Sequence, residues 1–192
     1  MENVQGAEME PANETLERAY NLSVWLANES SSLLEVYIDL QGFSEPPLGL
    51  PSAQLELPAP PADDWDQARR LRHHHTDCRL LAALLRRVLD EQQELNETGH
   101  HFHHQLQFAI TGLEGLVANL GLILSSLGFP VEGEGAEEEV DSEGHQPPSS
   151  SSGFAHWEAK VKGYHVIAHY NDWIGRTVEE LERLKDNLKP EA

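Results

Sequence analysis

Histidine is the residue type whose number and spacing most suggest chemistry in this sequence of 192 residues. Most of the 11 histidines fall into three groups: His73 to His75, His100 to His104, and the pair His165 and His169. Two imidazoles four residues apart on a helix can share a zinc or copper ion. The alternative is that they are polar surface residues near helix ends, because no cysteine or ordered carboxylate accompanies them. We therefore expect no functional metal site and no cofactor.

The usual catalytic motifs are missing from the chain. The sequence contains no GxxxxGK[ST] phosphate loop, no GxGxxG, no HExxH and no GxSxG. Di-iron helical bundles need two inward-facing Glu-x-x-His motifs. The only match, Glu97 to His100, contains Gly99 and falls in a predicted turn. The sequence thus predicts no enzyme and no catalytic residue.

Charge excludes further classes of function. The chain carries 33 Asp and Glu against 13 Lys and Arg, a formal charge of −20. Nucleic acids and anionic membranes would be repelled, because their binding draws on clustered Lys and Arg. No stretch reaches the ~18–20 uninterrupted apolar residues that span a bilayer. We expect neither a nucleic-acid partner nor membrane insertion.

Cysteine and asparagine bear on the cellular compartment. Cys78 is the only cysteine, so no intramolecular disulfide can form. Four N-x-Ser/Thr sequons are possible N-glycosylation sites, at Asn13, Asn21, Asn28 and Asn96. The first twenty residues are acidic and contain no apolar leader segment. We therefore expect either the mature form of a secreted protein or export without a leader.

Long tracts without proline predict helices. Their expected ranges are about 14–40, 64–95, 102–127 and 155–188. The third shows the clearest apolar stripe, with members three and four residues apart: Phe102, Leu106, Ala109, Leu113, Leu116, Leu120, Ile123 and Leu127. Cys78 falls on the apolar stripe of the second helix, and Trp25 widens that of the first. The fourth helix is expected to point these residues inward: Val161, Tyr164, Ala168, Ile174, Val178, Leu181 and Leu188. No alternating β pattern is present, so the fold class is all-α.

The connections predict the topology of one domain over residues 1–192. Residues 41–63, with six prolines, form a connection long enough to return along a bundle. Only about residues 96–100 separate the second and third helices. Residues 131–153 are long, acidic and expected to be disordered. Long, short and long connections indicate an up-up-down-down four-helix bundle with two crossover loops.

Four segments resemble one family. They are AYNLSVWL with VYIDLQGF in the first helix, Trp65 before ARRL, LEGLVANLGLILSSLGFP, and WEAKVKGYHVIAHYNDWIGRTVEELERLK. In order and spacing they resemble the interleukin-6-type long-chain four-helix cytokines, within them the ciliary neurotrophic factor branch. The resemblance implies a secreted cytokine that assembles ciliary neurotrophic factor receptor alpha, glycoprotein 130 and the leukaemia inhibitory factor receptor, and so triggers JAK/STAT signalling.

By the same resemblance, the alpha-receptor face falls on Trp65, Arg176 and Glu180. Trp173 lies at helical spacing from the last two, so we expect these helix residues to form an exposed row with Arg183. Trp and Arg are residues that often dominate binding energy at interfaces. The alternatives are that Trp65 folds onto the bundle, and that Arg176 and Glu180 are an ordinary surface pair.

The family's Phe-x-x-Lys motif, which contacts the leukaemia inhibitory factor receptor, becomes Trp157 to Lys160 here, with Phe154 one turn earlier. The alternative is that Trp157 caps the core. The glycoprotein 130 face is usually built from the first and third helices, and no short motif names its residues in this chain. Glycans on Asn21 and Asn28 would obstruct part of the first helix, so we expect at most partial occupancy.

Two other hypotheses remain open at this point. A cytosolic helical scaffold or lipid carrier would account for the reduced cysteine, because fold alone does not give function. A histidine-rich metal-binding bundle is the other.

Overall fold

Four helices form the described part of the chain. The computed structural model describes residues 4–47, 55, 57–129 and 152–188, without the side chains of residues 4–12, 152 and 154. The helices are α1 (Val4–Gln41), α2 (Gln67–Leu95), α3 (His100–Ser126) and α4 (Ser152–Asn187), and the described ranges contain no strand. The all-α class is confirmed. Most of the acidic connection expected at 131–153 lies outside the described residues.

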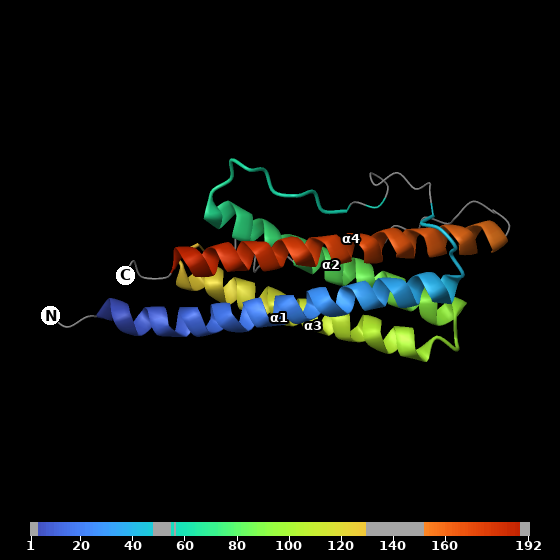
Figure 1. The fold of residues 1–192 in the computed structure, drawn as a ribbon, viewed down its shortest axis with the longest axis horizontal. Helices are drawn as coiled ribbons and strands as arrows, with labels where there is room; N and C mark the ends of the chain where they lie inside the picture. The colour runs from blue at the N-terminus through green and yellow to red at the C-terminus, as the bar shows by residue number, and fades with distance from the viewer. Residues whose placement is uncertain (1–3, 48–54, 56, 130–151, 189–192) are drawn as a thin grey trace, which may run out of the picture.

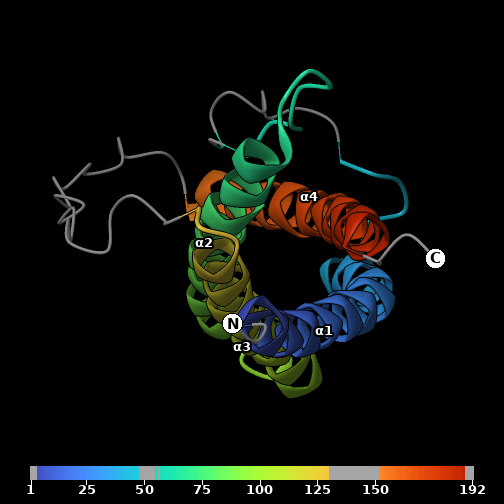
Figure 2. The ribbon, with the colours of Figure 1, turned by 90° about the vertical axis from the view of Figure 1, so that its left-hand side faces the viewer.

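The helices run up, up, down and down, as the connections predicted (Figure 1). α1 packs against α3 and α4, and α2 packs against the same two helices. Seen from the end, the four helices surround one shared interior (Figure 2). Every packed pair is antiparallel, so both ends of the chain lie at the same end of the bundle (Figure 1).

Local sequence signals explain several helix ends. Asp66 caps α2, where its carboxylate accepts a hydrogen bond of 2.8 Å from the Arg69 backbone N–H. Gly42 and Gly128, which follow α1 and α3, have φ angles of 70° and 74°, a conformation that favours glycine. At its other end α1 begins at Val4 rather than near Glu14, so the helix continues through Pro11, where one backbone hydrogen bond is lost.

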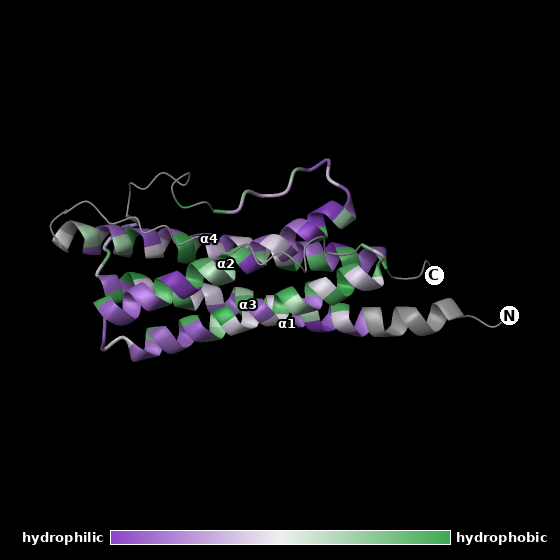
Figure 3. Ribbon diagram, turned by 180° about the vertical axis from the view of Figure 1, so that it is seen from behind, coloured by the Kyte–Doolittle hydropathy of each residue, from purple (hydrophilic) through white to green (hydrophobic). Residues whose placement is uncertain are grey.

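The core follows the apolar stripes of the helices, along which hydrophobic residues recur (Figure 3). The predicted stripe of α3 is buried from Phe102 to Ile123, and Cys78 of α2 is buried opposite α4. Burial raises the pKa of the Cys78 thiol to about 12, so it packs as a small apolar group. Among the described helices, α3 alone is long and apolar enough to cross a membrane, yet its stripe packs inside this bundle.

The buried stripe of α4 differs from the predicted one. The residues that point inward are Val161, Val166, Ile167, Tyr170, Trp173, Ile174, Thr177, Glu180, Leu181 and Leu184. Of the residues that we expected to point inward, Val161, Ile174 and Leu181 are buried, whereas Tyr164, Ala168, Val178 and Leu188 are only half-buried. Successive residues of a helix differ by about 100° in direction. If the predicted centre of the apolar stripe is wrong by one residue, whole rows of side chains are therefore assigned to the core instead of the surface, or the reverse. This shift brings Trp173 and Glu180 inside.

Two glycines let α1 approach its neighbours closely. A Cβ atom on Gly112 of α3 would lie 2.5 Å from Cδ2 of Leu26, and one on Gly163 of α4 would overlap the Tyr37 hydroxyl. Tyr37 is fully buried, and its hydroxyl donates a hydrogen bond of 2.8 Å to the Lys160 carbonyl. The Tyr37 ring is therefore held between α1 and α4 by packing and by this hydrogen bond.

We expect Gly163→Ala to lower the free energy of unfolding by about 1–3 kcal/mol, because a methyl group forced into a packed core displaces its neighbours. Gly175→Ala is the matched control on the same helix, since nothing lies within 4 Å of its Cβ position. That control should gain up to about 1 kcal/mol from helix propensity. Urea unfolding of both variants tests the close approach, and equal stability of the two would contradict it.

Candidate functional site

Trp65 stands at the start of α2, one residue before the Asp66 cap. Its side chain is half-buried, and the guanidinium of Arg69 lies 4.0 Å from the centre of its indole ring. The cation and the ring hold each other in place through a cation–π contact. This side of the bundle therefore presents a partly exposed tryptophan with an exposed arginine on it.

A ladder of aromatic rings connects Trp65 to the interior. His73 lies edge-on between two tryptophans, with its ring centroid 4.9 Å from that of Trp65 and 5.6 Å from that of Trp173. On α4, His169 stacks against Trp173 at 6.0 Å. Trp173 is 1% exposed, so the expected exposed row is wrong at this residue. Trp173 instead lies in the interior below Trp65, with His73 between the two rings.

The chain that leads into α2 is fixed to this ladder. The Nε2 of His73 lies 2.8 Å from the Ala59 carbonyl and 3.0 Å from a carboxylate oxygen of Asp77. The Ala59 carbonyl can only accept a hydrogen bond, so Nε2 carries a proton and donates it there. Burial raises the pKa of Asp77 to about 6, against the opposing effect of His73. The position of Trp65 therefore depends on contacts of its own loop as well as on the helix cap.

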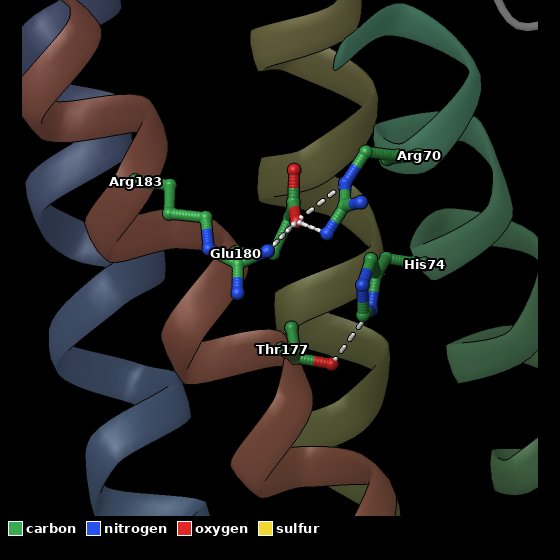
Figure 4. Close-up of polar contacts among 5 residues, drawn as sticks. All are labelled: Arg70, His74, Thr177, Glu180 and Arg183. Carbon is green, nitrogen blue, oxygen red and sulfur yellow. Dashed lines mark hydrogen bonds and ion pairs between the residues drawn. The ribbon is translucent and has the colours of Figure 1, made fainter. Parts of the chain in front are cut away.

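Glu180 faces inward from α4 and binds α2 (Figure 4). It is 4% exposed, and one of its carboxylate oxygens accepts hydrogen bonds of 2.9 and 2.7 Å from Nε and Nη2 of Arg70. Arg183 adds a second cation at 3.6 Å, and the bond to Glu180 raises the pKa of Arg70. The expectation that Glu180 lies in an exposed row is therefore wrong, because its charge is satisfied inside the protein.

His74 extends this polar layer one turn further along α2 (Figure 4). Its Nδ1 lies 3.0 Å from the Thr177 hydroxyl, which itself donates to the Trp173 carbonyl at 3.2 Å. The hydroxyl must therefore accept from a protonated Nδ1. Burial lowers the pKa of His74 to about 4, so the ring stays neutral at physiological pH. His74 is a buried structural residue.

Arg176 is exposed, as expected, on the turn of α4 between Trp173 and Glu180. Burial lowers the pKa of His169, as it does that of His74, and the nearby positive charge of Arg176 adds to both shifts. The predicted alpha-receptor residues thus separate into two layers. Trp65 and Arg176 reach the surface, whereas Trp173 and Glu180 lie beneath them.

The far end of the bundle presents a second aromatic surface. Trp157, near the start of α4, is 50% exposed, and its ring meets Phe43 edge-on with the centroids 5.7 Å apart. This exposure contradicts the alternative that Trp157 only caps the core. Lys160 is half-buried, and its carbonyl accepts the Tyr37 hydrogen bond. The side chain of Phe154 lies outside the described residues.

Sequence reasoning named no residues for a third surface, between α1 and α3. Trp25 is 44% exposed and Phe108 is 52% exposed, and both line a cavity of about 50 Å³. Gln105 also lines it, and its buried Oε1 has no hydrogen-bond partner in the described part of the chain. Counting Trp25 with the core stripe was wrong. Its position directly before the buried Leu26, at the edge of the stripe, was the available signal.

Comparison with known proteins identifies the family. Residues 21–181 match the model of the LIF / OSM family. The chain is 31% identical to cardiotrophin-2 of Mus musculus over 181 residues, which cover 90% of this chain and 84% of that protein. It is 32% identical to mouse cardiotrophin-1 over 174 residues, covering 88% and 84%, and 30% identical to cardiotrophin-2 of Pan troglodytes over 188 residues, covering 93% and 87%. The chain belongs to the LIF / OSM family.

This membership confirms the resemblance to interleukin-6-type cytokines and makes the chain a cytokine rather than an enzyme. It favours the cytokine hypothesis over the scaffold and metal-binding alternatives. Within the described ranges, no group of three or more His, Cys, Asp and Glu side chains is placed to hold a metal ion. The four sequon asparagines differ in exposure: Asn13, Asn21 and Asn28 are exposed on α1, and Asn96 is half-buried.

Glu180→Gln should destabilise this cytokine by about 1–3 kcal/mol, because Arg70 keeps its charge in a mostly buried position and loses its anion. Glu179→Gln, an exposed neighbour on the same helix, should change stability by no more than about 0.5 kcal/mol. Chemical unfolding followed by circular dichroism measures both. Equal changes in the free energy of unfolding for the two substitutions would show that the buried pair of Arg70 and Glu180 does not stabilise the protein.

Acid should destabilise the protein through His74. Between the ordinary histidine pKa of 6.5 and the folded value of about 4, the unfolded chain binds a proton at this site that the folded chain does not. Wild-type stability due to His74 is therefore lost as the pH falls through this window. The His74→Gln variant cannot bind that proton. Its free energy of unfolding should therefore be lower than that of the wild type at pH 7, and the difference should become smaller at pH 5.

Urea unfolding at both pH values measures this deficit. His101→Gln is the control, because it removes an exposed histidine of α3 instead of a buried one. A deficit of His74→Gln that is the same at both pH values would contradict the role of His74.

Proposed function

We propose that this chain is a secreted cytokine that joins ciliary neurotrophic factor receptor alpha, glycoprotein 130 and the leukaemia inhibitory factor receptor into one complex, and so triggers JAK/STAT signalling. The observation that carries the proposal is the presence of aromatic anchors that reach the surface at three places on one bundle: Trp157 and Trp25, which are exposed, and Trp65, which is partly exposed. A ligand that holds several receptors needs separate surfaces, each with a few anchors of high contact area.

The alpha-receptor surface consists of Trp65, Arg69, Arg176 and Arg183 in this proposal. The Arg69 contact holds Trp65 at the surface, and Arg176 and Arg183 are exposed on α4. Trp173 and Glu180 act from beneath as positioning residues, because both are buried. Three of these four residues are arginines, in a chain of net charge −20, and we expect them to meet acidic groups of the receptor.

The surface for the leukaemia inhibitory factor receptor consists of Trp157, Phe43 and Lys160, with Phe154 as a further candidate. Trp157 and Phe43 support each other edge-on, and Phe43 also contacts Tyr164 edge-on at 6.1 Å. Sixteen residues of α4 separate Trp157 from Trp173, which is about 24 Å along the helix. Two receptors could therefore bind these two surfaces without competing for residues.

The glycoprotein 130 surface lies, in this proposal, between α1 and α3 around Trp25 and Phe108. These two side chains flank the small cavity, and Gln105, whose buried Oε1 has no hydrogen-bond partner among the described residues, lines it as well. An anchor residue of the receptor inserted there would bury both aromatic rings.

Trp65→Ala should weaken binding to immobilised ciliary neurotrophic factor receptor alpha by about tenfold or more, a loss of at least about 1.4 kcal/mol, and leave the leukaemia inhibitory factor receptor unaffected. Trp157→Ala should give the reverse pattern, so each variant is the control for the other. Surface plasmon resonance measures both affinities, and circular dichroism checks that both variants are folded.

Arg176→Ala should follow the pattern of Trp65→Ala. Phosphorylation of STAT proteins in cells that carry all three receptors then tests the signalling output, which either tryptophan variant should reduce. If the folded wild-type protein binds none of the three receptors, the proposed complex is wrong. If each variant loses both receptors equally, the assignment of separate surfaces is wrong.

A further inference from the structure

We propose that N-linked glycosylation of Asn21 and Asn28 closes the α1–α3 surface around Trp25, so that the protein exists in an open and a glycan-covered form. The modification itself does not depend on which receptor uses this surface. Its consequence for glycoprotein 130 rests on the proposed function.

The two sequons flank Trp25 on one face of α1. Asn21 lies four residues before Trp25 and Asn28 three residues after it, and all three side chains are exposed. At 3.6 residues per turn, both asparagines lie within about 60° of Trp25 around the helix and within about 6 Å of it along the axis. A branched oligosaccharide on either residue would therefore stand beside the exposed indole.

The cavity next to Trp25 also comes close to these sites. Glu29 and Ser30, the second and third residues of the Asn28 sequon, line it together with Trp25 and Phe108. Asn28 itself does not line it, because one residue turns the helix by about 100°, so a glycan on Asn28 begins on the other side of Trp25, within one turn of the hollow. A branched sugar there would stand beside Trp25, in the path of a protein partner that approaches the indole.

The burial of the serine hydroxyl groups of the two sequons determines at which stage of folding the asparagines can be glycosylated. Ser23 and Ser30 are buried, with exposures of 0% and 1%. The Ser23 hydroxyl donates to the Tyr20 carbonyl at 2.8 Å, and that of Ser30 lies 2.8 Å from the Ala27 carbonyl and 2.7 Å from Oδ1 of Asn171 on α4. A transferase that must read this hydroxyl cannot reach it in the folded bundle. Transfer therefore has to precede the packing of α1 against α4.

The transfer step uses a lipid-linked oligosaccharide diphosphate as the donor. The Nδ2 atom of the asparagine forms a bond to C1 of the first sugar, and the bond between C1 and the diphosphate oxygen breaks. The lipid diphosphate leaves, and the proton lost from the amide nitrogen balances its charge. No oxidant or reductant is needed, and Asn21 and Asn28 retain one amide hydrogen each.

The other two sequons provide comparisons within the chain. Asn96 follows α2, where its Nδ2 donates to Oε1 of Gln92 at 2.7 Å, and Thr98 is exposed. Asn13 lies twelve residues before Trp25, about 18 Å along the helix. Glycans at these positions should not cover Trp25.

The experiment uses the full chain, secreted by mammalian cells behind a cleavable leader. Mass spectrometry of peptides first measures the occupancy of each sequon. Hydroxyl-radical footprinting then compares the glycosylated protein with the same sample after enzymatic removal of its glycans. Trp157 is the internal reference, because its exposure of 50% is close to the 44% of Trp25.

We expect glycans on Asn21 and Asn28, and lower oxidation of Trp25 and Phe108 that recovers after glycan removal while Trp157 stays constant. Binding to the glycoprotein 130 ectodomain should be at least tenfold weaker for the glycosylated form. The double variant Asn21→Gln, Asn28→Gln should bind like the deglycosylated protein, and Asn96→Gln should not restore binding.

Two results would overturn the inference: bare asparagines at both positions after passage through the secretory pathway, or occupied sites with unchanged oxidation of Trp25. If glycans protect Trp25 but the glycan-free protein does not bind glycoprotein 130, the covered surface stands and the proposed receptor contact fails. The footprint and the binding measurement therefore separate the two proposals.

Discussion

A buried carboxylate needs a cation, and the pairing of Glu180 with Arg70 meets that need where α2 packs against α4. The desolvation of both charges is offset only when their geometry is held closely, so the pair fixes the register of one helix on the other. That register places Trp173 under His73, and His73 under Trp65. The position of the partly exposed Trp65 thus depends on the salt bridge between Arg70 and Glu180, although Trp65 is not part of it.

The same dependence holds at the other end of the bundle. Tyr37 can lie against α4 because position 163 has no side chain, and its hydroxyl binds the Lys160 carbonyl close to the exposed Trp157. In a close-packed protein interior, the displacement of one side chain also displaces its neighbours. The separation between the Trp65 and Trp157 surfaces is therefore a property of the whole bundle.

Surface charge and surface aromatic residues follow different patterns in this protein. The chain as a whole is strongly acidic, yet Arg69 lies on Trp65, and Arg70 and Arg183 pair with Glu180. The surface between α1 and α3 instead combines exposed aromatic rings with two sequons. One bundle thus offers faces of different chemistry, and differences of this kind are what allow a protein to discriminate between partners.

The sequence by itself determined the helices, their order and their up-up-down-down arrangement, because apolar periodicity, proline positions and connection lengths are local properties of the chain. It also identified Trp65, Arg176 and Trp157 as surface candidates through motif resemblance. Only the tertiary structure decided which side of α4 is buried, since Trp173 and Glu180 lie within about 100° of residues that could equally have marked the stripe. It alone brought Trp25 and Phe108 together from two helices, because no local pattern records which edges of two helices meet.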